Sequence, residues 1–174
     1  LNVTGTQTSA LSIDSATNTA IRINNVTLDS GSGAFTLGDG TGSGATAFAI
    51  TLGGAGGQIH AWTNNSSTTA TVNSDVAFGL GGGGNHALNI TGTGNWDLKN
   101  SLTPTNGANL SIHKTGAGTL NLSGGGGLRS GVAGYGANFG SVFKEGVTNM
   151  VTGAYTFNNG ATNSEIVIGG LDPV

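Results

Sequence analysis

Short segments with apolar residues at positions i and i+2 recur along most of this chain, from Leu11-Ser12-Ile13 to Leu120-Asn121-Leu122. Clusters of Gly, Ser, Asn and Thr separate these segments. Alternation with a period of two is typical of half-buried β-strands, and the intervening residue types favour turns. We find no stretch of a dozen residues with the 3.6-residue period of an amphipathic helix. The pattern therefore predicts an all-β protein built from many short strands.

One part of this pattern repeats after 24 residues. Residues 87–98 align without gaps on residues 111–122, and both contain the sequence Ser/Thr-Gly-x-Gly-x-apolar-x-apolar. Residues 30–37 contain a third copy. Repeats of 20–50 residues indicate solenoids, propellers or arrays, and a propeller blade needs four strands in about 40 residues. A β-sandwich also uses short strands but does not usually repeat linearly. We therefore predict a parallel β-helix (β-solenoid) of roughly seven rungs.

The repeat assigns a role to each of its positions. Glycines should form tight corners that keep successive rungs in register, and the apolar pair should form a ladder in the interior. The predicted corner glycines are Gly31, Gly33, Gly92, Gly94, Gly116 and Gly118. The predicted core ladder is Phe35, Leu37, Leu88, Trp96, Leu98, Ile112, Leu120 and Leu122.

The last third of the chain departs from this pattern and is richer in aromatic residues. We predict β-solenoid rungs over 1–127, an irregular insertion or atypical rung over 128–153, and the final strand or strands over 154–174. The aromatic side chains there, Tyr135 and Phe139 among them, either pack over the solenoid or form a contact surface for a partner.

Composition excludes several classes of function. Only 7% of residues are charged and the formal net charge is −3, so no basic stripe is available to bind nucleic acid. No apolar run approaches the roughly 20 residues that a transmembrane helix needs. The chain has no cysteine, which removes disulfides and thiolate chemistry and suits a protein that crosses a periplasm unfolded. The chain begins at Leu1 and reads as a mature or excised segment, so the lack of a signal peptide does not argue against secretion.

Residues Lys114 to Gly124 read Lys-Thr-Gly-Ala-Gly-Thr-Leu-Asn-Leu-Ser-Gly. This segment resembles the autotransporter-associated β-strand repeat of bacterial surface proteins, and residues 91–98 and 30–37 resemble degenerate copies that lack the lysine. The family's usual Asn-Thr-Tyr continuation is replaced here by a glycine run. The resemblance implies a parallel β-helix that is exported to the outer cell surface, with a scaffold, adhesion or fibre role.

Residues that could perform chemistry are few. His60 and His113 flank apolar strand positions and are expected to point to solvent, and no pair among His60, His86 and His113 has the spacing of a metal site on one strand. Asp75 and Asp97 are 22 residues apart and could meet on adjacent rungs, with Lys99 nearby. This trio is the one candidate catalytic constellation, and its alternative is three solvated surface residues. Asp39 lies in a Gly-Asp-Gly sequence that lacks the tandem pattern of calcium-binding nonapeptides.

Three functional hypotheses follow. The first is a structural, non-enzymatic and extracellular segment without cofactor or metal, whose partner is a glycan or a cell surface. The second is a filament subunit that associates end to end by strand pairing, since solenoid ends are open sheet edges. The third is a carbohydrate-binding or polysaccharide-cleaving β-helix. In this third case Trp62 is the better candidate for stacking on a sugar, because Trp96 occupies an interior position of the repeat.

Overall fold

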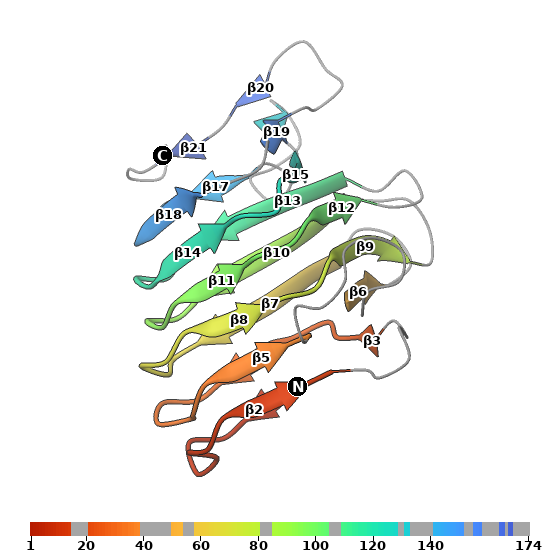
Figure 1. The fold of residues 1–174 in the computed structure, drawn as a ribbon. Coiled ribbons are helices and arrows are strands. Elements are labelled where there is room, and N and C mark those ends of the chain that lie inside the picture. Colours follow the sequence, from red (N-terminus) through yellow and green to blue (C-terminus); the bar gives the residue numbers. More distant parts are fainter. Residues whose placement is uncertain are drawn as a thin grey trace.

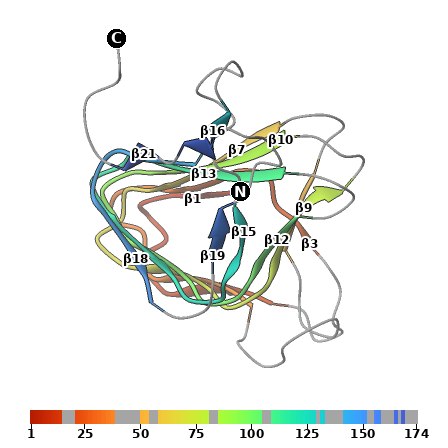
Figure 2. The ribbon, with the colours of Figure 1, turned by 90° about the horizontal axis from the view of Figure 1, so that it is seen from above.

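Three parallel β-sheets run along the axis of a coiling chain in the computed structural model (Figure 1). Each turn of the chain adds one strand to each sheet, and the strands lie around a common interior when viewed along the axis (Figure 2). The structure describes residues 1–14, 21–38, 50–53, 58–80, 85–104, 109–128, 131–132, 141–151, 155–157, 164–165 and 167–168. No helix occurs in these segments.

The strands of each sheet follow one another in chain order. Sheet A contains β1 (Asn2–Val3), β4 (Val26–Leu28), β7 (Gln58–Asn64), β10 (Asn85–Thr91), β13 (Asn109–Lys114), β17 (Val142–Phe143) and β21 (Val167–Ile168). Sheet B contains β2 (Leu11–Ile13), β5 (Phe35–Leu37), β8 (Ala70–Val72), β11 (Trp96–Leu98), β14 (Thr119–Leu122) and β18 (Val147–Met150). Sheet C contains β3 (Ile21–Arg22), β6 (Ile50–Gly53), β9 (Val76–Leu80), β12 (Leu102–Pro104), β15 (Gly126–Leu128) and β19 (Tyr155–Phe157).

This arrangement confirms the predicted β-solenoid, with slightly fewer rungs than expected. The described strands form six coils of three strands, and β21 follows the sixth coil in sheet A. The expected count assumed 24 residues for every coil. That spacing holds where Trp96 pairs with Leu120, but Phe35 pairs with Ala70, 35 residues further along the chain. Because several coils carry longer connections, the same chain length makes fewer of them.

In-register pairing stacks like positions into columns along the axis. In sheet B, Leu37 pairs with Val72, Val72 with Leu98, and Leu98 with Leu122, and all four side chains are buried. All eight residues of the predicted core ladder belong to this buried core. Full burial of one aliphatic or aromatic side chain contributes about 1.5–3 kcal/mol. A single coil cannot bury its inward face, so stability comes from the stack.

The corner between sheets A and B requires glycine. A Cβ on Gly94 would meet the carbonyl oxygen of Ser66 in the coil before it, and a Cβ on Gly118 would meet that of Gly94. Gly92 has a φ of 95°, which L-residues rarely adopt, and a Cβ there would meet the backbone of Asn64. All six predicted corner glycines lie at this corner, where one coil passes closely over the next.

The segment expected to be irregular continues the stack in part. In this segment β17 pairs with β13, and β18 pairs with β14, both in parallel. By contrast, β16 (Gly131–Val132) pairs antiparallel with β20 (Ser164–Glu165) outside the three sheets. The predicted boundaries at residues 127 and 153 stay a prediction.

We predict that Gly92→Ala lowers the free energy of unfolding by about 2 kcal/mol or more. The alanine would have to adopt a left-handed backbone conformation, and its Cβ would clash with the backbone of Asn64. Thr93→Ala is the matched control at the same corner, since Thr93 is exposed, and it should change stability by less than about 0.5 kcal/mol. Urea denaturation measures both. Equal effects of the two substitutions would contradict the close packing of the corner.

Candidate functional site

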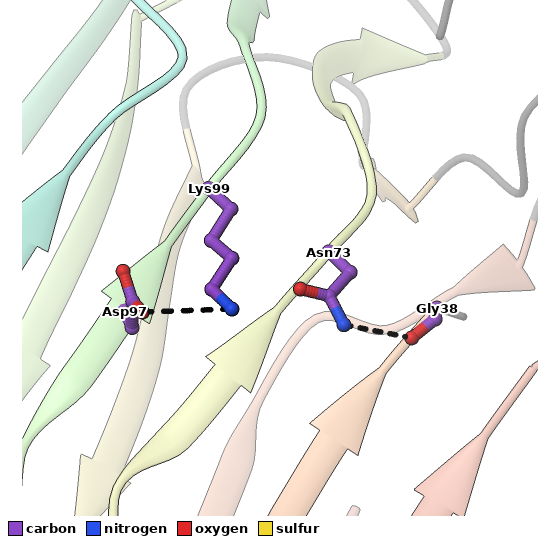
Figure 3. A network of polar contacts seen from close by, with 4 residues as sticks. All are labelled: Gly38, Asn73, Asp97 and Lys99. Atoms are coloured by element: carbon purple, nitrogen blue, oxygen red, sulfur yellow. Dashed lines mark hydrogen bonds and ion pairs between the residues drawn. The ribbon is translucent and has the colours of Figure 1, made fainter. Parts of the chain in front are cut away.

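The two carboxylates of the candidate catalytic trio make different contacts. Asp97 faces outward from β11, and its carboxylate lies 4.0 Å from the amine of Lys99 (Figure 3). Lys99 is 51% exposed and Asp97 25% exposed, so this ion pair adds little stability. The Asp75 carboxylate instead accepts hydrogen bonds from the backbone N–H (3.1 Å) and hydroxyl (2.7 Å) of Ser101, which holds one coil to the next. The two carboxylates therefore serve separate contacts.

The neighbouring polar side chains also connect coils. The Asn73 side chain donates to the carbonyl of Gly38, 3.3 Å away in the preceding coil (Figure 3). The Asn100 side chain donates in turn to the carbonyl of Asn73. These amides bridge backbone groups of successive coils at the end of sheet B, and each contributes a hydrogen bond to the stack.

Two sequence expectations about β7 are wrong, and for one reason. His60 was expected to face solvent and Trp62 to be the exposed tryptophan, yet they are 2% and 0% exposed. Ile59, an apolar neighbour of His60, is 55% exposed. In β7 the inward positions are His60, Trp62 and Asn64, because Trp62 pairs with Ile90 in the core. A strand has two faces, so an error of one residue in assigning them exchanges inside for outside.

Trp62 and Trp96 pack against each other inside the solenoid. Their ring centroids are 5.3 Å apart and their planes are tilted by 30°. Neither indole N–H has a hydrogen-bond partner in the described part of the chain. Since both rings are fully buried, neither tryptophan offers a stacking platform for a sugar. Tyr135 and Phe139, the other candidate contact residues, lie outside the described residues.

The lysine of the repeat motif is buried as well. Lys114 is 1% exposed and pairs with Ile90 on one side and Phe143 on the other, within an inward column of sheet A. Its amine donates to the carbonyl of Gly116 and, at 3.1 Å, to that of Glu145. Burial lowers the pKa of Lys114, and the Glu145 carboxylate opposes this shift. Lys114 thus ties the A–B corners of two successive coils together.

At the N-terminal end of the described structure, the first coil has a neighbouring coil on one side only. A cavity of about 380 Å³ lies there, and we call its lining the N-terminal face: Leu1, Ile13, Ile21, Arg22, Ile23, Asn24 and Asn25. Strands β1, β2 and β3 each end their sheet and so have a strand partner on one side only. Leu1 is 48% exposed. This end of the described structure therefore combines apolar side chains with three sheet edges.

The remaining sequence candidates do not form a metal centre. Within the described segments, no three His, Cys, Asp or Glu side chains are grouped closely enough to hold a metal ion. Asp39 lies outside the described residues. His113 faces outward from β13, as expected, but it is largely covered rather than open to solvent, and its Nε2 atom is buried. Nor does the described part of the chain contain a helix that could span a membrane.

The fold defines this protein as a β-solenoid repeat protein. Comparison of the chain with protein-family profiles, with curated proteins and with solved structures gives no significant match. The likeness to the autotransporter-associated repeat therefore depends on the motif from Lys114 to Gly124.

The contact of His60 with His86 and the buried position of Lys114 were missed by the sequence analysis. Trp62 was a signal for the face on which His60 lies, though not for its contact with His86, since the bulkiest side chain of a strand favours the interior. His60, two residues away, shares its face. No comparable sequence signal marks Lys114 as buried, because lysine is ordinarily a surface residue.

We predict that Trp62 and Trp96 stabilise the fold cooperatively. A double-mutant cycle of Trp62→Phe and Trp96→Phe, measured by urea denaturation, should give a coupling free energy of about 0.5–1.5 kcal/mol. The same cycle with Trp62→Phe and Asn149→Ala is the control, because Asn149 is exposed, and it should be additive. Additivity of the two tryptophans would contradict their contact.

Proposed function

We propose that this chain is a non-catalytic structural segment of an exported, surface-displayed bacterial β-solenoid protein. The observation that carries the proposal is the use of the polar side chains. Asn73, Asp75 and Lys114 each bind backbone or side-chain groups of a neighbouring coil rather than converging on a shared cleft. Side chains used in this way stiffen a rod and leave little for a reaction centre.

The outer wall of sheet B suits a scaffold. Outward residues form a column of small polar side chains with a single acid: Ser12, Thr36, Thr71, Asp97, Asn121 and Asn149. Within this column, the Asn149 amide donates to the side-chain oxygen of Asn121 at 2.9 Å. Such a wall is polar and carries little charge, and a glycan or cell-surface partner is proposed for it. The tryptophan-based carbohydrate site loses its support, since both indoles are buried.

Export and surface display are supported by the motif at Lys114–Gly124 and by the absence of cysteine. A chain without cysteine forms no disulfide that would block its passage through a narrow pore. After export, each coil can fold onto the coil before it, because neighbouring coils pair strand to strand as β10 pairs with β13.

We predict that the chain, placed between a signal peptide and an outer-membrane translocator in a Gram-negative laboratory strain, reaches the cell surface and resists added protease there. Leu98→Asp is the control, because a carboxylate at this buried position disrupts the core. The Leu98→Asp protein should be exported but digested. Antibody binding to intact cells and immunoblotting after protease treatment measure the two steps.

Retention of the wild-type chain inside the cell, or its digestion as rapidly as Leu98→Asp, would contradict the proposal. Hydrolysis of a polysaccharide by the displayed chain, if lost in Asp97→Asn, would contradict its non-catalytic part.

Self-association through the N-terminal face is the second proposal. Every internal coil buries the inward side chains of its neighbours, whereas Leu1, at the end of an inward column, is half exposed. The backbone N–H of Leu11 donates to the carbonyl of Ala34, and the carbonyl of Ile13 accepts from the N–H of Gly38, the two residues that flank β5. This pairing directs the backbone groups of Ser12 to the other edge of β2. The face can therefore receive a strand from a second copy.

We predict concentration-dependent association that Leu1→Lys weakens by placing a charge on the N-terminal face. Ile59→Lys is the matched control, since Ile59 is comparably exposed (55%) but lies on the side wall in β7. Light scattering after size-exclusion chromatography, with electron microscopy, should show assemblies for wild type and Ile59→Lys only. A wild-type chain that stays monomeric at all concentrations would contradict this proposal.

A further inference from the structure

Two imidazole rings meet inside the solenoid, where sheet A is paired most extensively. His60 on β7 and His86 on β10 are 2% and 1% exposed. The Nε2 atom of His60 lies 3.4 Å from the Nδ1 atom of His86. The ring centroids are 5.6 Å apart and the ring planes are parallel to within 3°. The pair links the third coil of the stack to the fourth.

The distances show how the rings are arranged. The distance between the ring centroids is 2.2 Å longer than the distance between the two nitrogens (5.6 minus 3.4). Each nitrogen lies about 1.1 Å from the centroid of its own ring, so the two nitrogens lie almost on the line that joins the centroids. Rings stacked face to face with these nitrogens in contact would bring their centroids much closer together. The rings therefore lie nearly in one plane and meet edge to edge, nitrogen against nitrogen.

This geometry accommodates a single proton between the rings. One neutral imidazole donates its N–H and the other accepts with a lone pair. When both rings are protonated, two N–H groups face each other and the hydrogen bond is lost. The Nε2 atom of His86 is also buried without a partner in the described structure, so a charge on this ring has no compensating contact there.

The described strands around the pair provide no counter-charge. Strands β4, β9 and β12 contain no Asp, Glu, Lys, Arg or His, and neither do the connecting sequences 54–57, 81–84 and 105–108. Adjacent β13 carries His113, which faces outward, and Lys114, which faces inward but directs its amine to the corner carbonyls of Gly116 and Glu145. No carboxylate of the described strands packed against the pair faces it.

We propose that the His60–His86 pair is an acid-sensitive lock on the stack, which joins the third and fourth coils while both rings are neutral and opens when they gain protons. The device differs from the scaffold function and does not depend on export. It makes the rod firm at neutral pH and loosens its middle in an acidic compartment.

The direction of the pH dependence follows from the pKa values. Burial, together with a smaller contribution from the adjacent His86, lowers the pKa of His60 to about 4. Burial also lowers the pKa of His86. In the unfolded chain both imidazoles titrate near 6.5. The unfolded state therefore binds more protons below pH 6.5, and stability falls as the pH drops from 6.5 toward 4.

The test compares thermal unfolding at pH 7 and pH 5, a range in which ordinary carboxylates change little. The melting temperature of the wild type should fall by several degrees. The double variant His60→Gln/His86→Gln should lose most of this fall, and His113→Gln, the outward-facing control, should retain it. A double variant whose melting temperature falls as far as that of the wild type would overturn the proposal.

Proton NMR of the wild-type imidazoles tests the lock without a variant. The His60 ring should keep the chemical shift of a neutral imidazole down to about pH 5, and the His86 ring should titrate below the pH at which a free imidazole does. The protection factors of the amides in β7 and β10, which correct for the intrinsic exchange rate at each pH, should then decrease below about pH 5 before those in β14 do. Titration of the His60 and His86 rings near pH 6.5 in the folded protein would overturn the proposal.

Discussion

Close passage of one coil over the next is the constraint on which the rest of this structure depends. Parallel pairing in register aligns Leu37, Val72, Leu98 and Leu122 into one buried column, and a shift of one residue would turn such a row outward. The A–B corner permits this register because Gly94 and Gly118 let backbone meet backbone. Burial of the column and glycine at the corner therefore depend on each other. The aliphatic side chains stay buried only if successive coils lie close together, and glycine allows the backbones to approach that closely at the corner.

The interior is not purely aliphatic, and several of its buried polar side chains join coils. The buried Asn64 side chain donates to the carbonyls of Thr68 and Asn95, and Lys114 reaches two successive corners. His60 and His86 form a direct bridge between two coils. Such buried polar groups are costly unless they are bonded, so they make the stack depend on particular partners. This explains how a chain with 7% charged residues can specify one register.

The fold could be predicted from the sequence, but the contacts of the buried polar side chains could not. The 24-residue repeat predicted both the coil and its ladder, because the glycines and the apolar pair occupy equivalent positions in three copies. Around His60 the sequence is ambiguous: Ile59 and Ala61 form one apolar alternation, and Trp62 belongs to the other. Only pairing with β10 decides between them. The contact of His60 with His86 also spans coils of unequal length, so no fixed repeat could have placed the two rings together.

The stacking itself is tested most directly by distances between spin labels on paired cysteines, since the chain has no native cysteine to interfere. Positions 12, 36 and 149 share the outward column of sheet B. Stacked strands are about 4.8 Å apart. Labels at Thr36 and Asn149, four strands apart, should therefore lie about 19 Å apart, and labels at Ser12 and Asn149 about 24 Å apart. The predicted result is a distance that grows by one strand spacing for each coil between the labels. Equal distances for the two pairs, or a shorter distance for Ser12 and Asn149, would contradict the solenoid.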